Sequence, residues 1–136
     1  MASADPLYLE ENIESIPQVE TIIKEIANRF GLSSDLHGNM LISLTEAVNN
    51  AIIHGNQNDK SKCVKMHISK DGENIAFQVT DEGKGFDHTQ LPDPTAPENL
   101  LRLNGRGVFL MHQLCDQIDY LNDGRTVKMS FHLCQQ

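Results

Sequence analysis

Apolar residues in one stretch recur every three or four positions, which is the spacing of a helix with one buried face. They are Ile16, Val19, Ile22, Ile23, Ile26, Ala27 and Phe30. The preceding letters "SIPQ" have the form of a capping box, with Ser15 as N-cap, Gln18 reaching back and Pro17 in the first turn. Gly31 follows the last apolar residue. We predict a helix that begins after Ser15 and ends at Gly31.

Two further stretches carry the same helical spacing. The second pattern begins near Ser34 or Asp35 and ends in "HGN" at Gly55. Its expected buried stripe is Leu36, Met40, Leu44, Ala47, Val48 and Ala51. The third pattern lies in "GRGVFLMHQLCDQ", and its apolar residues are Val108, Leu110, Met111, Leu114 and Cys115. The sequence therefore predicts about three helices.

Other stretches alternate apolar and polar residues, as a strand with one buried face does. In "CVKMHISKDGENIAFQVTDEG" the alternating apolar residues are Val64, Met66, Ile68, Ile75, Phe77 and Val79. Asp71-Gly72 stands between the two runs and predicts a β-hairpin. A second hairpin is predicted in "IDYLNDGRTVKMSFHL", turned at Asp123-Gly124, and "LYLEENIESI" is expected to be extended up to Ser15.

The order of these elements, β-α-α-β-β-loop-α-β-β, groups the strands in adjacent pairs, which is typical of α+β proteins. We predict a mixed, largely antiparallel sheet with the helices on one face. The length of 136 residues fits a single domain, and no repeat or domain boundary is visible. Residues 87–104 contain Pro92, Pro94 and Pro97 and no sustained period. Loops of this length in a small domain are usually functional or mobile.

Composition and charge narrow the range of functions. Apolar content of 39% and charged content of 22% are ordinary for a soluble globular protein. The net charge of −8 argues against binding to a nucleic-acid backbone, although it is compatible with a nucleotide ligand. Neither a signal peptide nor an apolar run of roughly 18 residues is visible. We therefore expect a cytoplasmic protein that neither binds nucleic acid directly nor enters a membrane, with its three cysteines reduced.

The side chains that can carry chemistry lie in three separate motifs. In "EAVNNAIIHGN", Glu46, Asn50 and His54 stand at steps of four on one expected helix face, with Asn49 beside them. "DEGKGFD" follows the first hairpin, and a plain turn explains such a motif more often than a ligand site does. "GRG" at 105–107 precedes an apolar helix, where unpaired N–H groups favour an anion, although a hinge is the other interpretation.

Two of these side chains have no assigned chemistry. We expect His54 to be mainly structural, since a helix-end histidine commonly satisfies a carbonyl group or the helix dipole. The role of Asn49 stays open. The six histidines show no spacing typical of a zinc site.

Together, the three motifs resemble those of the GHKL, or Bergerat-fold, ATPases. Within these, the chain looks most like the bacterial anti-sigma-factor serine kinases, over nearly its whole length. "EAVNNAIIHGN" corresponds to the N-box, "DEGKGFD" to the first glycine box and "NGRGVFLM" to the second. Each motif alone is weak, whereas their order and spacing together are specific. The resemblance implies an α+β two-layer sandwich and a single ATPase domain over residues 1–136.

The resemblance also implies a role for individual residues. Glu46 is the implied general base, and Asn50 is the implied Mg²⁺ ligand, through an amide oxygen that suits a hard cation. Asp81 is implied to accept a hydrogen bond from the adenine amino group of ATP. The other implied ATP-binding residues are Gly83 and Gly85 around the adenine, Gly105, Arg106 and Gly107 at the phosphates, and Thr126 near the adenine. The loop of residues 87–104 is the implied lid.

The resemblance favours one function among several. Histidine kinases commonly carry an asparagine at the position of Glu46 and need a phosphoacceptor helix, whereas gyrase- and chaperone-type relatives are far longer. The implied function is an ATP- and Mg²⁺-dependent protein serine/threonine kinase that also sequesters a sigma factor. Its implied substrate is an anti-anti-sigma protein of the STAS type, and it is implied to work as a homodimer.

Two alternatives remain. One is a nucleotide-gated protein-binding module with little or no kinase activity, and the presence of Glu46 together with Asn50 weighs against it. The other is a partner-switch kinase that controls an output other than a sigma factor, which the sequence does not separate from the implied function.

Overall fold

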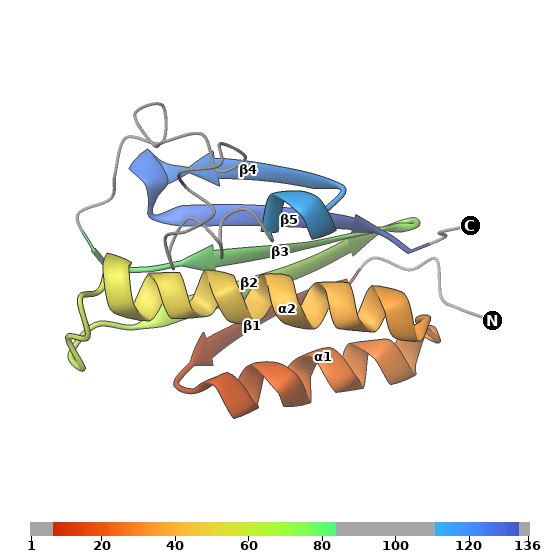
Figure 1. Ribbon diagram of the computed structural model, residues 1–136, viewed down its shortest axis with the longest axis horizontal. Helices are drawn as coiled ribbons and strands as arrows, with labels where there is room; N and C mark the ends of the chain where they lie inside the picture. Colours follow the sequence, from red (N-terminus) through yellow and green to blue (C-terminus); the bar gives the residue numbers. More distant parts are fainter. Residues whose placement is uncertain (1–6, 84–110, 134–136) are drawn as a thin grey trace.

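The computed structural model describes residues 7–83 and 111–133 and contains two long helices and five strands (Figure 1). The strands are β1 (Leu7–Ile13), β2 (Val64–Asp71), β3 (Asn74–Thr80), β4 (Gln117–Leu121) and β5 (Thr126–His132). The helical elements are α1 (Ile16–Phe30), α2 (Ser34–Asn50), the π-helix η1 (Ala51–Gly55) and the 3₁₀ turn η3 (Asn122–Gly124). Residues 111–114 are also helical. This order agrees with the order predicted from the sequence.

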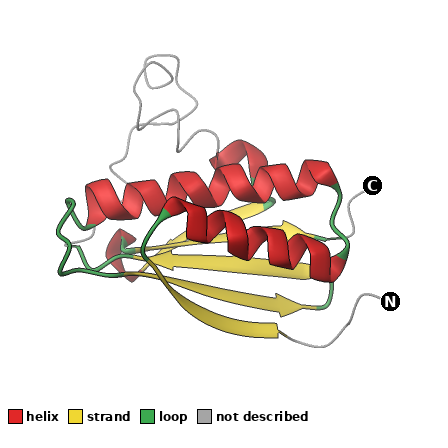
Figure 2. Cartoon of the chain, turned by 90° about the horizontal axis from the view of Figure 1, so that it is seen from below, coloured by secondary structure: helices red, strands yellow, loops and turns green. Residues whose placement is uncertain are grey.

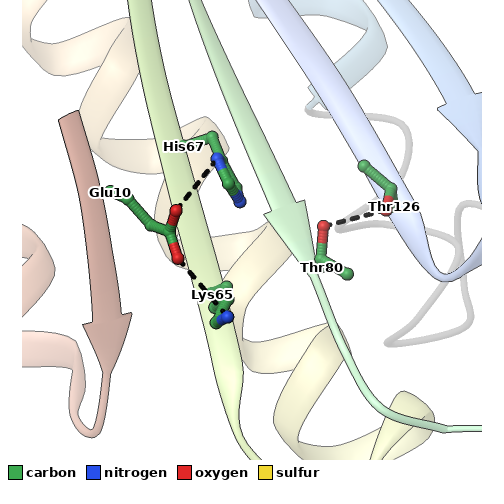
Figure 3. A network of polar contacts seen from close by, with 5 residues as sticks. All are labelled: Glu10, Lys65, His67, Thr80 and Thr126. Atoms are coloured by element: carbon green, nitrogen blue, oxygen red, sulfur yellow. Dashed lines mark hydrogen bonds and ion pairs between the residues drawn. The ribbon is translucent and has the colours of Figure 1, made fainter. Parts of the chain in front are cut away.

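The strands form one sheet in the order β1-β2-β3-β5-β4, and each of the four pairings is antiparallel. The helices α1 and α2 lie side by side on one face of this sheet (Figure 2). The opposite face carries polar side chains, among them the exposed ion pair of Glu10 and Lys65 at 3.3 Å (Figure 3). The predicted α+β class with a mostly antiparallel sheet is confirmed, and the described strands include no parallel pair.

The core lies between the helices and the inner face of the sheet. Its largest fully buried side chains are Phe77, Phe131, Ile23, Leu36, Met40, Leu44, Met66, Ile68, Ile75 and Met129. The Phe77 and Phe131 rings meet edge to face, with centroids 6.0 Å apart. Burial of each large apolar side chain contributes roughly 1.5–3 kcal/mol. The periodicities in the sequence therefore identified the buried faces of α1, α2, β2 and β3.

The start of α1 differs from the predicted capping box. Ser15 is the N-cap residue, but its side chain makes no capping hydrogen bond, so this part of the prediction is wrong. Gln18 does reach back, because its side chain accepts a hydrogen bond from the Glu14 N–H (2.8 Å) and donates one to the Asn12 carbonyl (2.7 Å). One amide thus ties the helix start to the end of β1.

The first hairpin turns one residue later than predicted. Asp71 pairs with Asn74 within the strands, so the two loop residues are Gly72 and Glu73. Gly72 supplies the left-handed conformation of the turn, at φ 62°. The second hairpin turns through η3, which contains the predicted Asp123-Gly124 pair.

Cys63 and Cys115 are free thiols, and Cys134 lies outside the described residues. Burial raises the pKa of the Cys115 thiol to about 11, which keeps it protonated near neutral pH. Within residues 7–83 and 111–133, no helix combines the length and hydropathy that a membrane crossing requires.

Two glycines of the helix layer, Gly31 and Gly38, provide a matched test of backbone conformation. Gly31 ends α1 at φ 62°, whereas Gly38 lies inside α2, and a Cβ at either position would meet nothing within 4 Å. Gly31→Ala is expected to lower the free energy of unfolding by about 1 kcal/mol, because alanine disfavours the left-handed conformation. Gly38→Ala is expected to raise it by roughly 0.5–1 kcal/mol through helix propensity. Urea denaturation measures both, and shifts of the same sign would contradict the assignment of the helix end.

Candidate functional site

The long helix of the N-box motif changes its winding where its polar residues end. α2 is a regular α-helix up to Asn50, and Ala51–Gly55 continue it as a π-helix, closed by a bond from the Asn56 N–H to the Ala51 carbonyl (2.8 Å). Turns of this kind are rare and occur frequently at functional sites. Glu46 and Asn50 lie one α-helical turn apart and are both half-buried. His54 lies in the π turn and is exposed, so the regular step of four ends at Asn50.

The π turn packs directly against the end of β3. A Cβ on Gly55 would lie 2.8 Å from Asp81 Oδ1 and still closer to Cγ of the same side chain. A Cβ on Gly83 would lie 2.9 Å from Asp81 Oδ1 and would overlap the Gly55 carbonyl. Real Cβ atoms do not come this close to other heavy atoms, so both positions require glycine in this arrangement. The helix end, Asp81 and Gly83 thus form one tightly packed unit.

Asp81 is held at two of its polar atoms, the main-chain N–H and the side-chain Oδ1. Its N–H donates to the Arg125 carbonyl (2.9 Å), and its Oδ1 accepts from the Gly83 N–H (2.8 Å). Its Oδ2 accepts no hydrogen bond from any residue in the described ranges 7–83 and 111–133. Burial raises the pKa of Asp81, while the Gly83 N–H and the charges of Arg125 and Lys62 act in the opposite direction. The second oxygen is therefore suited to accept a hydrogen bond from a ligand.

Asn56 is a buried residue of this site that the sequence analysis did not single out. Its Oδ1 accepts a hydrogen bond from the Glu82 N–H (2.8 Å), and its Nδ2 donates to the Cys63 carbonyl (3.1 Å). The letters "HGN" were interpreted only as the end of a helix. Because asparagine is common after helices, no signal in the sequence distinguishes this one.

Thr126 lies at the end of the sheet that also bears Asp81, but the two side chains are not brought together. The Thr126 hydroxyl is fully buried, 2.8 Å from the Thr80 hydroxyl, and accepts a hydrogen bond from Asn122 Nδ2 (2.9 Å) (Figure 3). The two threonines pair on the sheet face that also carries Lys65. Neighbouring residues of a strand point to opposite faces, so Asp81 is directed to the helix side.

The other predicted ligand-binding residues fall outside the described part of the chain. They are Gly85, Gly105, Arg106 and Gly107, together with the predicted lid of residues 87–104. In the part that is described, no cluster of three or more His, Cys, Asp or Glu residues is arranged to hold a metal ion. A magnesium ion held by one amide oxygen and the phosphates of a nucleotide does not need such a cluster.

Known proteins are similar to this chain in sequence and in fold. The family described as "Histidine kinase-like ATPase domain" matches residues 9–131. An anti-sigma F factor of Anoxybacillus flavithermus is 34% identical over 97 residues, which cover 66% of this chain and 65% of that relative. A serine-protein kinase RsbW of Bacillus subtilis is 28% identical over 137 residues, covering 93% of this chain and 86% of the relative.

A solved structure that contains the RsbU and RsbW domains of a Mycobacterium tuberculosis protein has the same fold. It superposes with a TM-score of 0.61 at 14% identity and covers 95% of this chain but only 32% of the other. At this identity the likeness concerns the fold alone. The matched family spans all the described elements from α1 to η3 and most of β1 and β5. The resemblance predicted from the motifs is confirmed, and the chain belongs to the histidine kinase-like ATPase domain family.

Proposed function

We propose that this chain is an ATP-dependent protein serine kinase and anti-sigma factor. Its proposed substrate is a serine hydroxyl on a separate, STAS-type anti-anti-sigma protein, and the proposed working form is a homodimer in the cytoplasm. The names of two relatives, an anti-sigma F factor and a serine-protein kinase, support this function. The observation that carries it is the packing of Gly55 on Asp81 and Gly83, which connects the helix of Glu46 and Asn50 to a carboxylate with an available oxygen.

The residues at the end of β3 fit the base of ATP. Asp81 Oδ1 is engaged by the Gly83 N–H, so the orientation of the carboxylate is fixed before a ligand arrives. Its Oδ2 is then the acceptor for the amino group of adenine. A half-buried carboxylate that pairs with one amino group discriminates strongly against a base that lacks this donor.

The polar residues of α2 follow the order of groups in a nucleotide. Asn50 precedes Gly55 by five residues, and Glu46 lies one further α-helical turn, about 6 Å, away from Asp81. A nucleotide whose base meets Asp81 and whose phosphates extend along α2 passes Asn50 before it reaches Glu46. Asn50 would hold Mg²⁺ through its amide oxygen. When bound, this ion would neutralise negative charge on the phosphates.

Glu46 is the proposed general base. Its carboxylate accepts the proton of the substrate serine as the serine oxygen attacks the γ-phosphorus, and the bond to the β-phosphate oxygen breaks, which yields phosphoserine and ADP. A regular helix with a buried stripe holds this side chain, because Leu44, Ala47 and Val48 are packed in the core around it. The packing of α2 thus supports Glu46 as a base held in a defined position.

Asp81→Asn tests the recognition of the base. We expect the variant to lose about 1.5–3 kcal/mol of ATP binding, because an amide in place of a carboxylate removes a charge-assisted hydrogen bond. The preference of the wild type for ATP over GTP should be lost as well. Isothermal titration with both nucleotides measures these changes, and unchanged affinities would refute the assignment of Asp81.

The stability of the same variant provides the control. Burial raises the pKa of Asp81, so the folded state favours the protonated carboxyl, and the charge costs stability above that raised pKa. Asp81→Asn removes this charge, and without nucleotide the variant should be at least as stable as the wild type at neutral pH. A lower melting temperature would attribute the loss of binding to unfolding.

Glu46→Gln and Asn50→Ala should separate catalysis from metal binding. Glu46→Gln should lower the rate of phosphate transfer by a factor on the order of 10²–10⁴, because the amide cannot accept a proton. Binding of Mg·ATP should be retained. Asn50→Ala should lose the gain in nucleotide affinity that Mg²⁺ provides. Phosphoserine formation on STAS-type proteins and titrations with and without Mg²⁺ are the two measurements.

Asn49→Ala is the matched control, because it removes the same half-buried amide one position earlier on the helix. It should retain both phosphate transfer and the gain in nucleotide affinity that Mg²⁺ provides. If it behaves like Asn50→Ala, the metal is not assigned to one side chain. If the wild type binds ATP and a sigma factor yet phosphorylates no STAS-type protein, the chain is a nucleotide-gated binding module.

A further inference from the structure

The buried side chain of Asn56 joins three segments of the chain. It is only 3% exposed and directly follows the π turn. Its Nδ2 donates to the Cys63 carbonyl, just before β2, and its Oδ1 accepts from the Glu82 N–H, just after β3. Its own N–H closes the π turn on the Ala51 carbonyl. Both the oxygen and the nitrogen of the Asn56 side-chain amide thus bond to main-chain groups.

The bond to Glu82 fixes the backbone at Asp81. The Glu82 N–H belongs to the peptide group that follows Asp81, and it is held by Asn56 at 2.8 Å. The peptide group that precedes Asp81 is held by the bond from its N–H to the Arg125 carbonyl at 2.9 Å. With both flanking peptide groups held, the main-chain torsions of Asp81 have little freedom. The direction of its Oδ2 then depends on Asn56.

The loop after Asn56 adopts an unusual conformation that completes this arrangement. Gln57 and Asn58 have φ values of 53° and 60°, in the left-handed region that side chains rarely adopt. The Asn58 N–H bonds to the Ile52 carbonyl (2.9 Å), and the Asp59 N–H bonds to the Asn56 carbonyl (3.0 Å). Strained residues of this kind persist where the surrounding structure determines them, and they cluster at ligand sites. Here the turn brings the Cys63 carbonyl to the Asn56 amide.

We propose that Asn56 is a positioning residue for base selection. It holds the backbone at Asp81 so that the carboxylate distinguishes the 6-amino group of adenine from the 6-oxo group of guanine. This inference rests on the proposed nucleotide-binding function and adds a residue that does not contact the base. Because hydrogen bonds weaken steeply when misaligned, a shift of the Asp81 backbone reduces the selectivity of the site.

The test compares two variants that separate the two bonds of Asn56. Asn56→Leu has a similar volume and removes both bonds. Asn56→Asp retains an acceptor for the Glu82 N–H but loses the donor to Cys63. The measured quantity is the ratio of the Kd for GTP to the Kd for ATP. A loss of folded protein changes both affinities equally and leaves this ratio unchanged, so a merely structural role would not alter it.

We expect Asn56→Leu to lower the ratio by about tenfold or more, because sub-ångström to 1 Å shifts at a binding group have effects of this size. Asn56→Asp should retain the wild-type ratio, even if its melting temperature falls. Asp59→Ala is the matched control, since it removes the bonds from Ser61 to Asp59 Oδ1 within the same loop without contact to Glu82. It should retain the ratio as well.

The outcomes separate this inference from the function on which it rests. If the wild type shows no preference for ATP, the proposed base recognition by Asp81 is wrong. If the wild type prefers ATP and Asp81→Asn abolishes the preference, but Asn56→Leu retains it, only the role of Asn56 is refuted. A loss of selectivity in Asp59→Ala also refutes it, because general loosening of the loop would then be sufficient. Should Asn56→Leu fail to fold, Asn56→Ala replaces it, with the same expected fall.

Discussion

The close contact of Gly55 with Asp81 and Gly83 is the constraint on which the candidate site depends. It joins the helix layer to the end of β3 without any intervening side chain, because a Cβ at either glycine would overlap its neighbours. The contact sets the distance between the carboxylate of Asp81 and the polar face of α2. Without it, the carboxylate and the pair Glu46 and Asn50 would be separate surface features. With this contact, the three side chains can bind one extended ligand.

The core holds the two sides of this contact in place. Met40, Leu44 and Val48 of α2 are fully buried against the sheet, which fixes the helix along and around its axis. The antiparallel pairing of β3 with β5 continues beyond Thr80, through the bond of the Asp81 N–H to the Arg125 carbonyl. Asp81 therefore extends a paired strand. Its half-buried carboxylate has a raised pKa, so its charge costs stability near neutral pH, as is common for groups retained at binding sites.

The sequence was sufficient for features that depend on local patterns. Alternation located β2 and β3, helical spacing located the buried stripes of α1 and α2, and Gly31 marked the end of α1, because these signals reflect burial and backbone freedom directly. The position of Asp81 directly after β3 followed from the same alternation. The motif order gave the family, since three signals at the right spacing are far more specific than any one of them.

Other features depend on tertiary contacts and were not predictable from local patterns. Nothing in "NNAIIHGN" signals the π turn, which lies where Gly55 packs against Asp81, a residue distant in the sequence. Ser15 makes no capping hydrogen bond, and the side chain of Gln18 bonds instead to Glu14 and Asn12 at the end of β1. The pairing of the Thr126 hydroxyl with Thr80 follows from the strand register, and the place of Thr126 near the adenine stays a prediction. In the sequence Asn56 is an ordinary residue after a helix. Its proposed role depends on the hydrogen bond from the Glu82 N–H, which belongs to a distant segment of the chain.

The affinity of Gly55→Ala for ATP tests the central claim most directly. The added Cβ displaces the Asp81 carboxylate, and we expect the Kd for ATP to rise by about tenfold or more, while far-ultraviolet circular dichroism stays that of the folded wild type. Gly38→Ala, which adds the same methyl group to α2 where nothing lies within 4 Å, should bind ATP like the wild type. A folded Gly55→Ala protein with the ATP affinity of the wild type would contradict the account, because the helix end would then not position the carboxylate.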